Sequence, residues 1–374
     1  MKKVIIIYGP TSQKHLIDSI IKHCSDGNLC IDAFCTGDYT FNGISRSQSI
    51  SHIYKIISKF LNVRFVGRIL DSLFLTPLLI QIAKEYDIID ITFFTNKYYR
   101  FLDYLISLNK KYKITIWGSD FYRASNEDRL KKAYYLENAK LIQVETTLVK
   151  RDVLMVYPSL FDKIKVCNYG IDLFHNIDSL RNKKFNLSGV DTGNCIVLTC
   201  GYNGSKAQQH LRILGLLSEL PAEIKKKIFL FLPMTYGVPN KTYLQDVEYA
   251  VQNTNISYHI FTNRLNNDEL AEMRLLSDIV INTQVTDAFS SSLLEHIYAG
   301  GILMAGDWLP YSVLTDVGIS YIPINFLNLK DELIHVIQNI KTEKQRMAQN
   351  IEKAMYFSSW KYKEKSLRNI FSKM

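Results

Sequence analysis

The chain has 374 residues, more than one hydrophobic core usually organises, and this length predicts two domains. Its hydrophobic content of 47% and charged content of 22% are typical of a folded soluble protein and exclude a disordered one. The 45 Lys and Arg residues against 36 Asp and Glu give a net charge of +9, which favours phosphorylated or membrane-surface partners. Because no Lys/Arg-rich arm is present, we expect no nucleic-acid partner.

The six cysteines include no Cys-x-x-Cys pair, and Cys35, Cys195 and Cys200 lie in apolar segments. Free thiols in a reducing compartment explain this pattern best, and we expect no metal site. The N-terminal apolar run is too short for a signal peptide, and the longest apolar stretch, 72–83, is well short of the roughly 20 residues of a membrane span. We therefore expect a cytoplasmic protein, either free or bound peripherally to the cytoplasmic face of a membrane.

Short β-branched segments alternate with longer amphipathic ones along the chain. A first group of expected strands comprises residues 4–8, 31–35, 89–94, 114–117 and 141–144. A second group comprises residues 195–200, 228–232, 256–261, 279–282, 302–305 and 321–324. Apolar residues spaced by three and four predict helices at 210–220, 268–276 and 293–299. This alternation predicts βαβ units and parallel sheets covered by helices on both faces.

A polar, turn-rich segment, 172–194, separates the two groups of strands and predicts a linker. Ligands of open α/β sheets bind outside the carboxyl ends of the strands. We therefore sought functional residues directly after each expected strand.

The turn after strand 195–200 is a candidate anion site. It contains Gly201, Asn203, Gly204, Ser205 and Lys206. A strand that runs through glycines into a helix presents N–H groups to a phosphate, and Lys206 adds a full charge. The sequence is neither a Walker A loop nor G-x-G-x-x-G, which disfavours an ATPase or a dinucleotide enzyme. His210, one helical turn further on, can reach the same anion. The alternative is an ordinary turn with a solvated lysine and a structural histidine.

Two carboxylates follow strand 279–282. Asp287 lies in a polar loop, Ser290 begins a serine run that caps the next helix, and Glu295 lies about one turn into that helix. Each carboxylate can accept hydrogen bonds from a hydroxyl-rich ligand. A solvated surface explains the pair equally well when it is taken alone.

Three further segments have both a functional and a structural interpretation. Tyr236, in the turn 233–237, can line a ligand pocket beside the candidate anion site, and Arg264, after strand 256–261, can contact a base or phosphate. Lys55 and Lys59 share one face of an apolar helix within 52–68, which can rest on anionic lipid. The structural interpretations are a plain turn, a surface arginine and a core helix with a charged stripe.

The segment from Asp287 through Phe289 to Glu295, followed by Tyr298-Ala-Gly-Gly301, resembles the Glu-x7-Glu motif of retaining glycosyltransferases of the GT-B fold. The resemblance implies that Asp287 contacts donor-sugar hydroxyls, that Glu295 contacts the nucleotide ribose, and that Phe289 and Ser290 line the same site. The chain departs from the motif in two places, because Asp287 replaces the first Glu and Ser290 replaces a Gly.

Other segments follow the order of that family. Trp117-Gly-Ser-Asp120 resembles its Gly-x-Asp segment near the acceptor, 166–172 resembles the segment that closes its first domain, and 358–360 precedes a helix like its last one. Within the second half, 201–210 and 232–237 are similar to TDP-N-acetylfucosamine:lipid II transferases. This similarity implies a bacterial surface-glycan transferase.

The resemblance implies an α/β protein of GT-B architecture, in which two Rossmann-like domains with parallel sheets face a central cleft. Residues 1–172, with a C-terminal helix 356–374 that crosses back, are expected to bind the acceptor, and residues 173–355 the nucleotide sugar. The expected acceptor is a glycan or a polyprenyl-diphosphate-linked sugar of a surface polysaccharide such as O-antigen, capsule or common antigen.

The implied reaction is transfer of a sugar from a nucleotide-diphosphate donor. The turn and Lys206 would stabilise the leaving diphosphate without a cofactor, and the absence of an Asp-x-Asp sequence agrees with metal-independent chemistry. Asp287 would act at the donor sugar of a retaining enzyme, and Asp120 would be the base if the reaction inverts. Two alternatives stay open: a nucleotide-sugar 2-epimerase of similar fold, and a binding protein with a decayed site.

Overall fold

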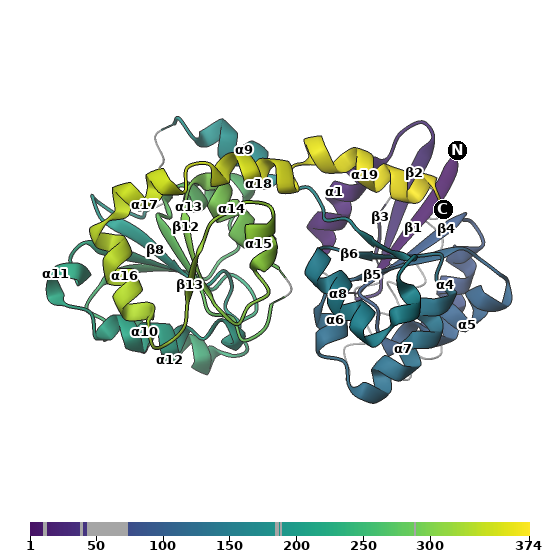
Figure 1. The fold of residues 1–374 in the computed structure, drawn as a ribbon, viewed down its shortest axis with the longest axis horizontal. Helices are drawn as coiled ribbons and strands as arrows, with labels where there is room; N and C mark the ends of the chain where they lie inside the picture. The colour runs from purple at the N-terminus through teal and green to yellow at the C-terminus, as the bar shows by residue number, and fades with distance from the viewer. Residues whose placement is uncertain (10–12, 38–39, 43–73, 184–186, 188, 288) are drawn as a thin grey trace. The chain divides into compact units, whose positions relative to one another are not determined.

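The computed structural model describes the chain except residues 10–12, 38–39, 43–73, 184–186, 188 and 288. It consists of two compact units (Figure 1). The first comprises Met1–Gly170 and Trp360–Met374, and the second comprises Ile171–Ser359. Each unit is an α/β structure built on its own sheet, so the predicted fold class is confirmed. The expected lipid-binding helix within 52–68 lies outside the described residues.

Within the described residues, the first unit has a seven-stranded sheet of order β3-β2-β1-β4-β5-β6-β7, parallel except for β3. The strands are β1 (Lys2–Tyr8), β2 (Leu29–Cys35), β3 (Thr40–Asn42), β4 (Ile88–Thr92), β5 (Tyr112–Ile116), β6 (Leu141–Val144) and β7 (Ile164–Val166). The helices are α1 (Lys14–Cys24), α4 (Thr76–Ala83), α5 (Tyr99–Ser107), α6 (Ser119–Tyr122), α7 (Asn126–Asn138), α8 (Thr147–Val156) and α19 (Trp360–Ser372), with 3₁₀ turns η3 (Asn96–Tyr98) and η4 (Pro158–Leu160).

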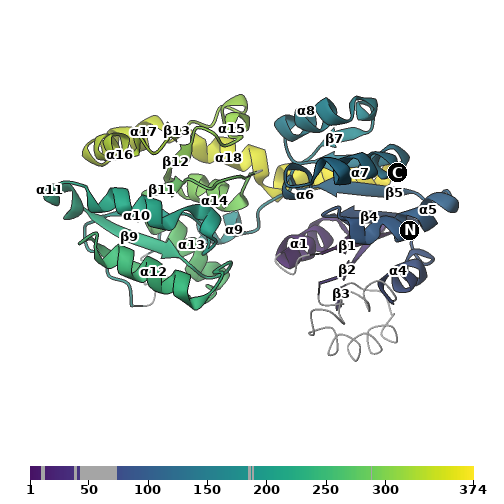
Figure 2. The same ribbon diagram turned by 90° about the horizontal axis from the view of Figure 1, so that it is seen from below.

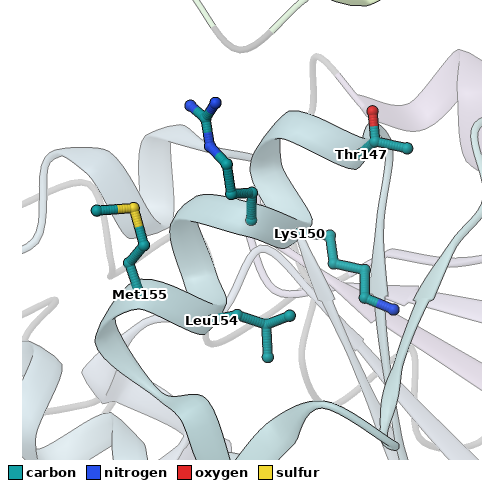
Figure 3. A pocket seen from close by; sticks show the side chains of 5 residues that line it. Thr147, Lys150, Leu154 and Met155 are labelled. Atoms are coloured by element: carbon teal, nitrogen blue, oxygen red, sulfur yellow. The ribbon is translucent and has the colours of Figure 1, made fainter.

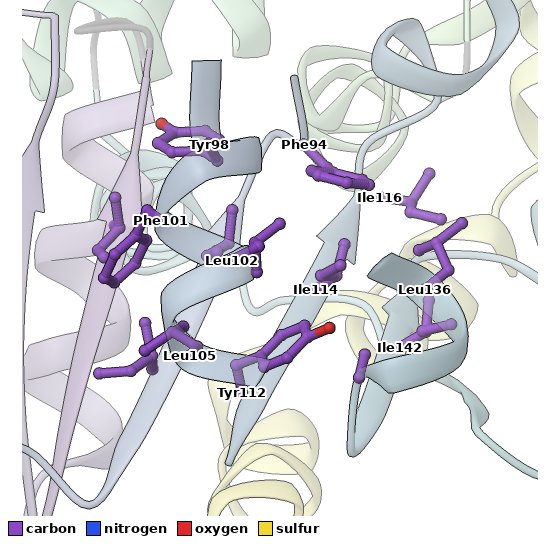
Figure 4. Packing of buried hydrophobic residues seen from close by; sticks show 14 of the residues in the cluster. Phe94, Tyr98, Phe101, Leu102, Leu105, Tyr112, Ile114, Ile116, Leu136 and Ile142 are labelled. Atoms are coloured by element: carbon purple, nitrogen blue, oxygen red, sulfur yellow. The ribbon is translucent and has the colours of Figure 1, made fainter. Parts of the chain in front are cut away.

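One face of this sheet carries the larger hydrophobic core of the unit. Phe101, Leu102 and Leu105 form the buried stripe of α5 because their spacing places them on one side of the helix. They pack over Ile114 of β5, as Figure 4 shows. Helices α4, α7 and α8 cover the same face, and the parallel strands beneath them are apolar almost throughout.

Helices α1 and α19 cover the opposite face, so the C-terminal helix belongs to the first unit (Figures 1 and 2). Trp360 begins α19, stacks on His23 of α1 with ring centroids 4.5 Å apart, and fills the space beside Gly170. Lys2 Nζ donates to the carbonyl oxygen of Ser372 at 2.9 Å, near the C-terminal end of α19. The helix expected at 356–374 is thus divided in two. Helix α18 (Asn350–Ser358) lies in the second unit, and α19 begins only after Ser359, which is not helical.

The second unit has, among its described residues, a six-stranded parallel sheet of order β10-β9-β8-β11-β12-β13. The strands are β8 (Ile196–Cys200), β9 (Ile228–Pro233), β10 (Ser257–Phe261), β11 (Ile279–Asn282), β12 (Ile302–Gly306) and β13 (Ile322–Ile324). The helices are α9 (Leu173–Leu180), α10 (His210–Ser218), α11 (Ala222–Lys225), α12 (Lys241–Gln252), α13 (Asn267–Leu276), α14 (Ser291–Ala299), α15 (Ser312–Asp316), α16 (Leu329–Gln338), α17 (Ile340–Arg346) and α18, with the 3₁₀ turn η5 (Lys206–Gln208).

Helices α10, α11, α12 and α16 pack on one face of the second sheet, and α9, α13, α14, α15 and α18 lie on the other. Every expected strand forms in the expected order, with its ends moved by at most two residues. The prediction of an irregular linker over 172–194 is wrong at its start, because residues 173–180 form α9. Phe174 of that helix stacks on Tyr298 of α14, with ring centroids 3.9 Å apart.

Candidate active site in the second unit

The candidate site lies at the carboxyl edge of the second sheet. All six strands run in the same direction, so the segments that follow them emerge at one edge. Strand β8 lies between β9 and β11, which brings the turns 201–205, 234–237 and 283–287 together. These three turns contain many of the residues predicted from the sequence.

The turn after β8 requires both of its glycines. Gly201 has a φ of +69°, and a Cβ on Gly204 would lie 2.3 Å from Cγ2 of Val238. The Gly204 amide donates to the Tyr236 carbonyl at 2.8 Å, and the Ser205 amide donates to Oδ1 of Asn203 at 2.9 Å. The Gly201 amide donates to the carbonyl of Ile281 in β11 at 2.9 Å. Three of the amides expected to face a phosphate are thus hydrogen-bonded within the protein.

The helix expected over 210–220 forms as α10, but the glycine turn does not run directly into it. The 3₁₀ turn η5 follows instead, Gln209 adopts a left-handed conformation with φ +60°, and α10 begins only at His210. The Ser205 hydroxyl caps η5 by accepting from the Ala207 amide at 3.3 Å. Lys206 is exposed, and its Nζ lies 5.4 Å from the centroid of the Tyr243 ring. The Lys206 ammonium group is therefore exposed to solvent beside the turn.

His210 is fully buried at the start of α10. Its Nδ1 lies 3.0 Å from the Tyr243 hydroxyl, and its Nε2 faces Gly201. Burial lowers the pKa of His210 to about 4, with a partial offset from the backbone of Asn203. The imidazole is therefore neutral at pH 7, and it can offer a hydrogen bond but no positive charge to an anion.

Asp287 is held by two tyrosines. Its Oδ2 accepts from the Tyr311 hydroxyl at 2.6 Å and from the Tyr202 hydroxyl at 3.4 Å. Tyr202 also contacts Gln284, and Asn282 donates to the Tyr311 oxygen at 2.6 Å. Burial, followed by the charge of Asp287, raises the pKa of both phenols, so they remain protonated and donate. These hydrogen bonds fix the orientation of the Asp287 carboxylate at the carboxyl edge of the sheet.

Glu295 is positioned by helices α13 and α14. Helix α13 begins with a capping box, in which the Asn266 side chain accepts from the amides of Asp268 and Glu269 at 3.0 Å. This helix carries the buried Arg274, whose Nη2 donates to Glu295 Oε2 at 3.0 Å. Helix α14 ends at Gly300 in a left-handed conformation, as a C-terminal cap requires.

Tyr236 connects the two carboxylates with the β8 turn. Its residue surface is 53% exposed, while its hydroxyl contacts the Asn203 side chain. The same hydroxyl is within electrostatic reach of Arg274, Glu295 and Asp287. The structure thus gathers Asn203, Tyr236, Asp287 and Glu295 around one region of the second unit.

Ser290 and Phe289 link the Asp287 loop to α14. Ser290 is the N-cap residue of α14, but its side chain makes no capping bond and contacts the Tyr202 hydroxyl instead. Phe289 packs edge-on against Tyr311 at 5.7 Å between ring centroids. Arg264, by contrast, is exposed after β10, an edge strand that β9 separates from β8. Its proposed contact with a base stays a prediction.

Asp120 belongs to the first unit and is almost wholly buried. Its Oδ2 accepts from the Phe94 amide and its Oδ1 from the Trp117 amide, both at 2.9 Å, so the carboxylate joins the segments that follow β4 and β5. Burial raises the pKa of Asp120 to about 6, although both amide bonds oppose the rise. Such a pKa suits a base, while the two occupied oxygens suit a structural anchor, and the predicted role stays a prediction.

Sequence reasoning missed the partners that hold the carboxylates, namely Tyr202, Tyr311 and Arg274, and also His296, which contacts Arg274. Tyr202 had a local signal, because it sits inside the glycine turn. Tyr311 and Arg274 had none, since they lie 24 residues after Asp287 and 21 residues before Glu295.

The structure was also searched for pockets, metal sites and membrane-spanning helices outside this site. An open depression of about 440 Å³ on the outside of α8 is lined by Thr147, Lys150, Arg151, Leu154 and Met155 (Figure 3). No cluster of three or more His, Cys, Asp or Glu side chains suited to a metal ion occurs in the described part of the chain. Among the described helices, none is long and apolar enough to cross a membrane.

Neither a protein-family model nor a curated protein sequence matches the chain. Solved structures do. A glycosyltransferase from Rickettsia africae matches with a TM-score of 0.70 and 14% identity, over 100% of this chain and 98% of that one. Anabaena HepE in complex with UDP matches with a TM-score of 0.68 and 12% identity over 100% of both chains. UDP-GlcNAc 2-epimerase from Neisseria meningitidis, bound to UDP-GlcNAc, matches with a TM-score of 0.59 and 13% identity, over 99% of this chain and 100% of that one. These similarities confirm the expected GT-B fold.

Proposed function

We propose that this protein is a glycosyltransferase that takes a sugar from a nucleotide-diphosphate donor bound at the carboxyl edge of the second unit. The acceptor is a glycan or a polyprenyl-diphosphate-linked sugar, and the product belongs to a bacterial surface polysaccharide. The reaction is metal-independent and retaining. The acceptor class and the pathway rest on the sequence resemblance described above.

One observation carries the proposal: Asp287 and Glu295, eight residues apart in the sequence, face the same region as the glycine turn after β8. Both are held by buried partners rather than left to solvent, Asp287 by Tyr311 and Glu295 by Arg274. If the two carboxylates were only solvated surface groups, these hydrogen bonds to Tyr311 and Arg274 would have no explanation. The full-length similarity to a solved glycosyltransferase, and the UDP held by HepE, agree with a nucleotide-sugar donor.

Each residue has a part that follows from its chemistry. Glu295 accepts hydrogen bonds from the ribose, and Asp287 accepts them from hydroxyls of the donor sugar. As the bond to the leaving diphosphate breaks, negative charge grows on its oxygens. Lys206 supplies the positive charge there, because His210 is neutral and three turn amides are already bonded. Such stabilisation matters most for the transition state.

A ligand screen tests the proposal. UDP, TDP, GDP and ADP are added separately, and thermal unfolding is followed; a ligand at 100 times its Kd stabilises the folded state by about 2.7 kcal/mol. We expect at least one nucleotide to stabilise the wild type and to stabilise Lys206→Ala less. Lys226→Ala is the matched control, because this exposed lysine precedes β9 and lies at the amino edge of the sheet. A flat response to all four nucleotides would indicate a decayed site.

A nucleotide-sugar 2-epimerase is the second candidate, favoured by the similarity to the Neisseria epimerase. An epimerase converts its nucleotide sugar without an acceptor, whereas a transferase requires one. Incubation with a panel of nucleotide sugars alone, analysed by NMR at C2, separates the two. Appearance of the 2-epimer without acceptor would replace the transferase proposal.

A further inference from the structure

A buried cation lies behind Glu295 and is fixed on every nitrogen of its guanidinium group. Arg274 is 2% exposed. Its Nε and Nη2 donate to Glu295 Oε2 at 3.1 and 3.0 Å, and its Nη1 contacts His296 Nε2 at 2.8 Å. The planar fork of an arginine can make these bonds at once, whereas the single ammonium of a lysine cannot.

His296 acts as a hydrogen-bond acceptor in this group. Arginine donates only, so His296 Nε2 carries the lone pair and the ring proton resides on Nδ1. Burial, followed by the charge of Arg274, holds the pKa of His296 well below its ordinary value. The ring is therefore neutral, and it orients Arg274 from the side opposite Glu295.

The arrangement leaves one oxygen of Glu295 open. An arginine that only neutralises a buried carboxylate commonly bonds both oxygens, in a fork-to-fork pair. Here both bonds end on Oε2, and no donor in the described part of the chain contacts Oε1. The Glu295 side chain keeps 11% exposure, and the exposed Tyr236 lies within electrostatic reach of it. Glu295 thus presents one oxygen without a protein donor at the site.

We propose that Arg274, oriented by His296, is a positioning residue that presents Glu295 Oε1 to the ribose hydroxyls of the nucleotide. This inference rests on the proposed function. It goes further by naming two residues, Arg274 and His296, that act on the ribose contact only through Glu295. Arg274 acts through Glu295, because both of its bonds to the carboxylate end on Oε2 and leave Oε1 without a protein donor.

The test compares a nucleoside diphosphate with its dideoxy analogue. Calorimetry measures the Kd of UDP and of 2′,3′-dideoxy-UDP, which lacks both hydroxyls but keeps the base and the diphosphate. A hydrogen bond to a charged acceptor predicts that the wild type binds UDP about 10- to 100-fold more tightly. In Arg274→Lys and His296→Leu we expect this ratio to fall towards one, with little change in the Kd of the dideoxy compound. His296→Gln, which keeps an acceptor, retains most of the ratio.

The outcomes separate the two proposals. Failure of the wild type to bind either nucleotide, or any nucleotide of the screen above, would overturn the proposed function and this inference with it. Binding of both compounds with a ratio that His296→Leu and Arg274→Lys leave unchanged would overturn the positioning role alone. If Arg274→Lys does not fold, the comparison of His296→Leu with His296→Gln still decides, because Gln keeps an acceptor for Arg274 and Leu does not.

Discussion

The contact between Gly204 and Val238 gives a prediction that can be worked out from distances. A Cβ on residue 204 would lie 2.3 Å from Cγ2 of Val238 and 3.2 Å from the Tyr236 carbonyl oxygen. The first distance forces a shift of more than an ångström in a segment that Gly204 also bonds through its amide. Overpacking of this kind costs about 1–3 kcal/mol. For a unit of this size, that corresponds to a fall in Tm of about 2–12 °C for Gly204→Ala.

A double-mutant cycle isolates the clash. Val238→Ala removes the methyl groups that the new Cβ would meet, so the double variant Gly204→Ala/Val238→Ala is expected to be more stable than the sum of the single effects by about 1–2 kcal/mol. Chemical unfolding of the four proteins, with the UDP Kd measured alongside, supplies the readouts. Additive effects, or a Gly204→Ala protein as stable as the wild type, would show that the turn does not pack as described.

Three further predictions concern the site. Lys206→Ala is expected to lower transfer by about 100-fold with unchanged unfolding, measured as kcat/KM with the donor varied, and a near-normal rate would remove Lys206 from the site. His210 has a pKa of about 4 in the folded protein and an ordinary value of 6.5, so the unfolded chain binds its proton first and stability falls as the pH drops from 6.5 to 4. His210→Asn is expected to reduce that loss by about 3 kcal/mol in urea unfolding across this window, and an unchanged slope contradicts the assignment. Tyr311→Phe should lower kcat/KM by about tenfold or more and Tyr202→Phe by less, because the Tyr311 and Tyr202 hydroxyls lie 2.6 and 3.4 Å from Asp287 Oδ2. A larger effect of Tyr202→Phe would contradict this network.

The alternation of strands and helices was predictable because parallel strands buried on both faces are apolar throughout. The short edge strands β3 and β7 were missed, since three residues give no usable period and Lys165 and Val166 of β7 are exposed. Helix α9 was missed because the polar, turn-rich residues that follow it dominate the composition of its segment. Its apolar face packs against residues distant in the sequence, such as Ala271 and Tyr298, the second of which stacks on Phe174.

The candidate site divides in the same way. The sequence alone determined which turns follow buried strands, and that two carboxylates stand beside a glycine-containing one. It also placed the helix of 210–220 after the glycine turn, but it did not show the 3₁₀ turn that separates the two. The 3₁₀ turn and the left-handed Gln209 arise from bonds such as that of Gln209 to the Thr283 carbonyl, which no local pattern contains.

What the sequence determined by itself is therefore the α/β class, the order of the strands along the chain and the side-chain chemistry at their ends. These follow from local periodicity and from residue type. The tertiary structure alone decided that His210 is buried and neutral, and that Arg274 takes one oxygen of Glu295 and leaves the other free. Hydrogen bonds and burial between distant segments control protonation and orientation, and only the folded sheet brings those segments together.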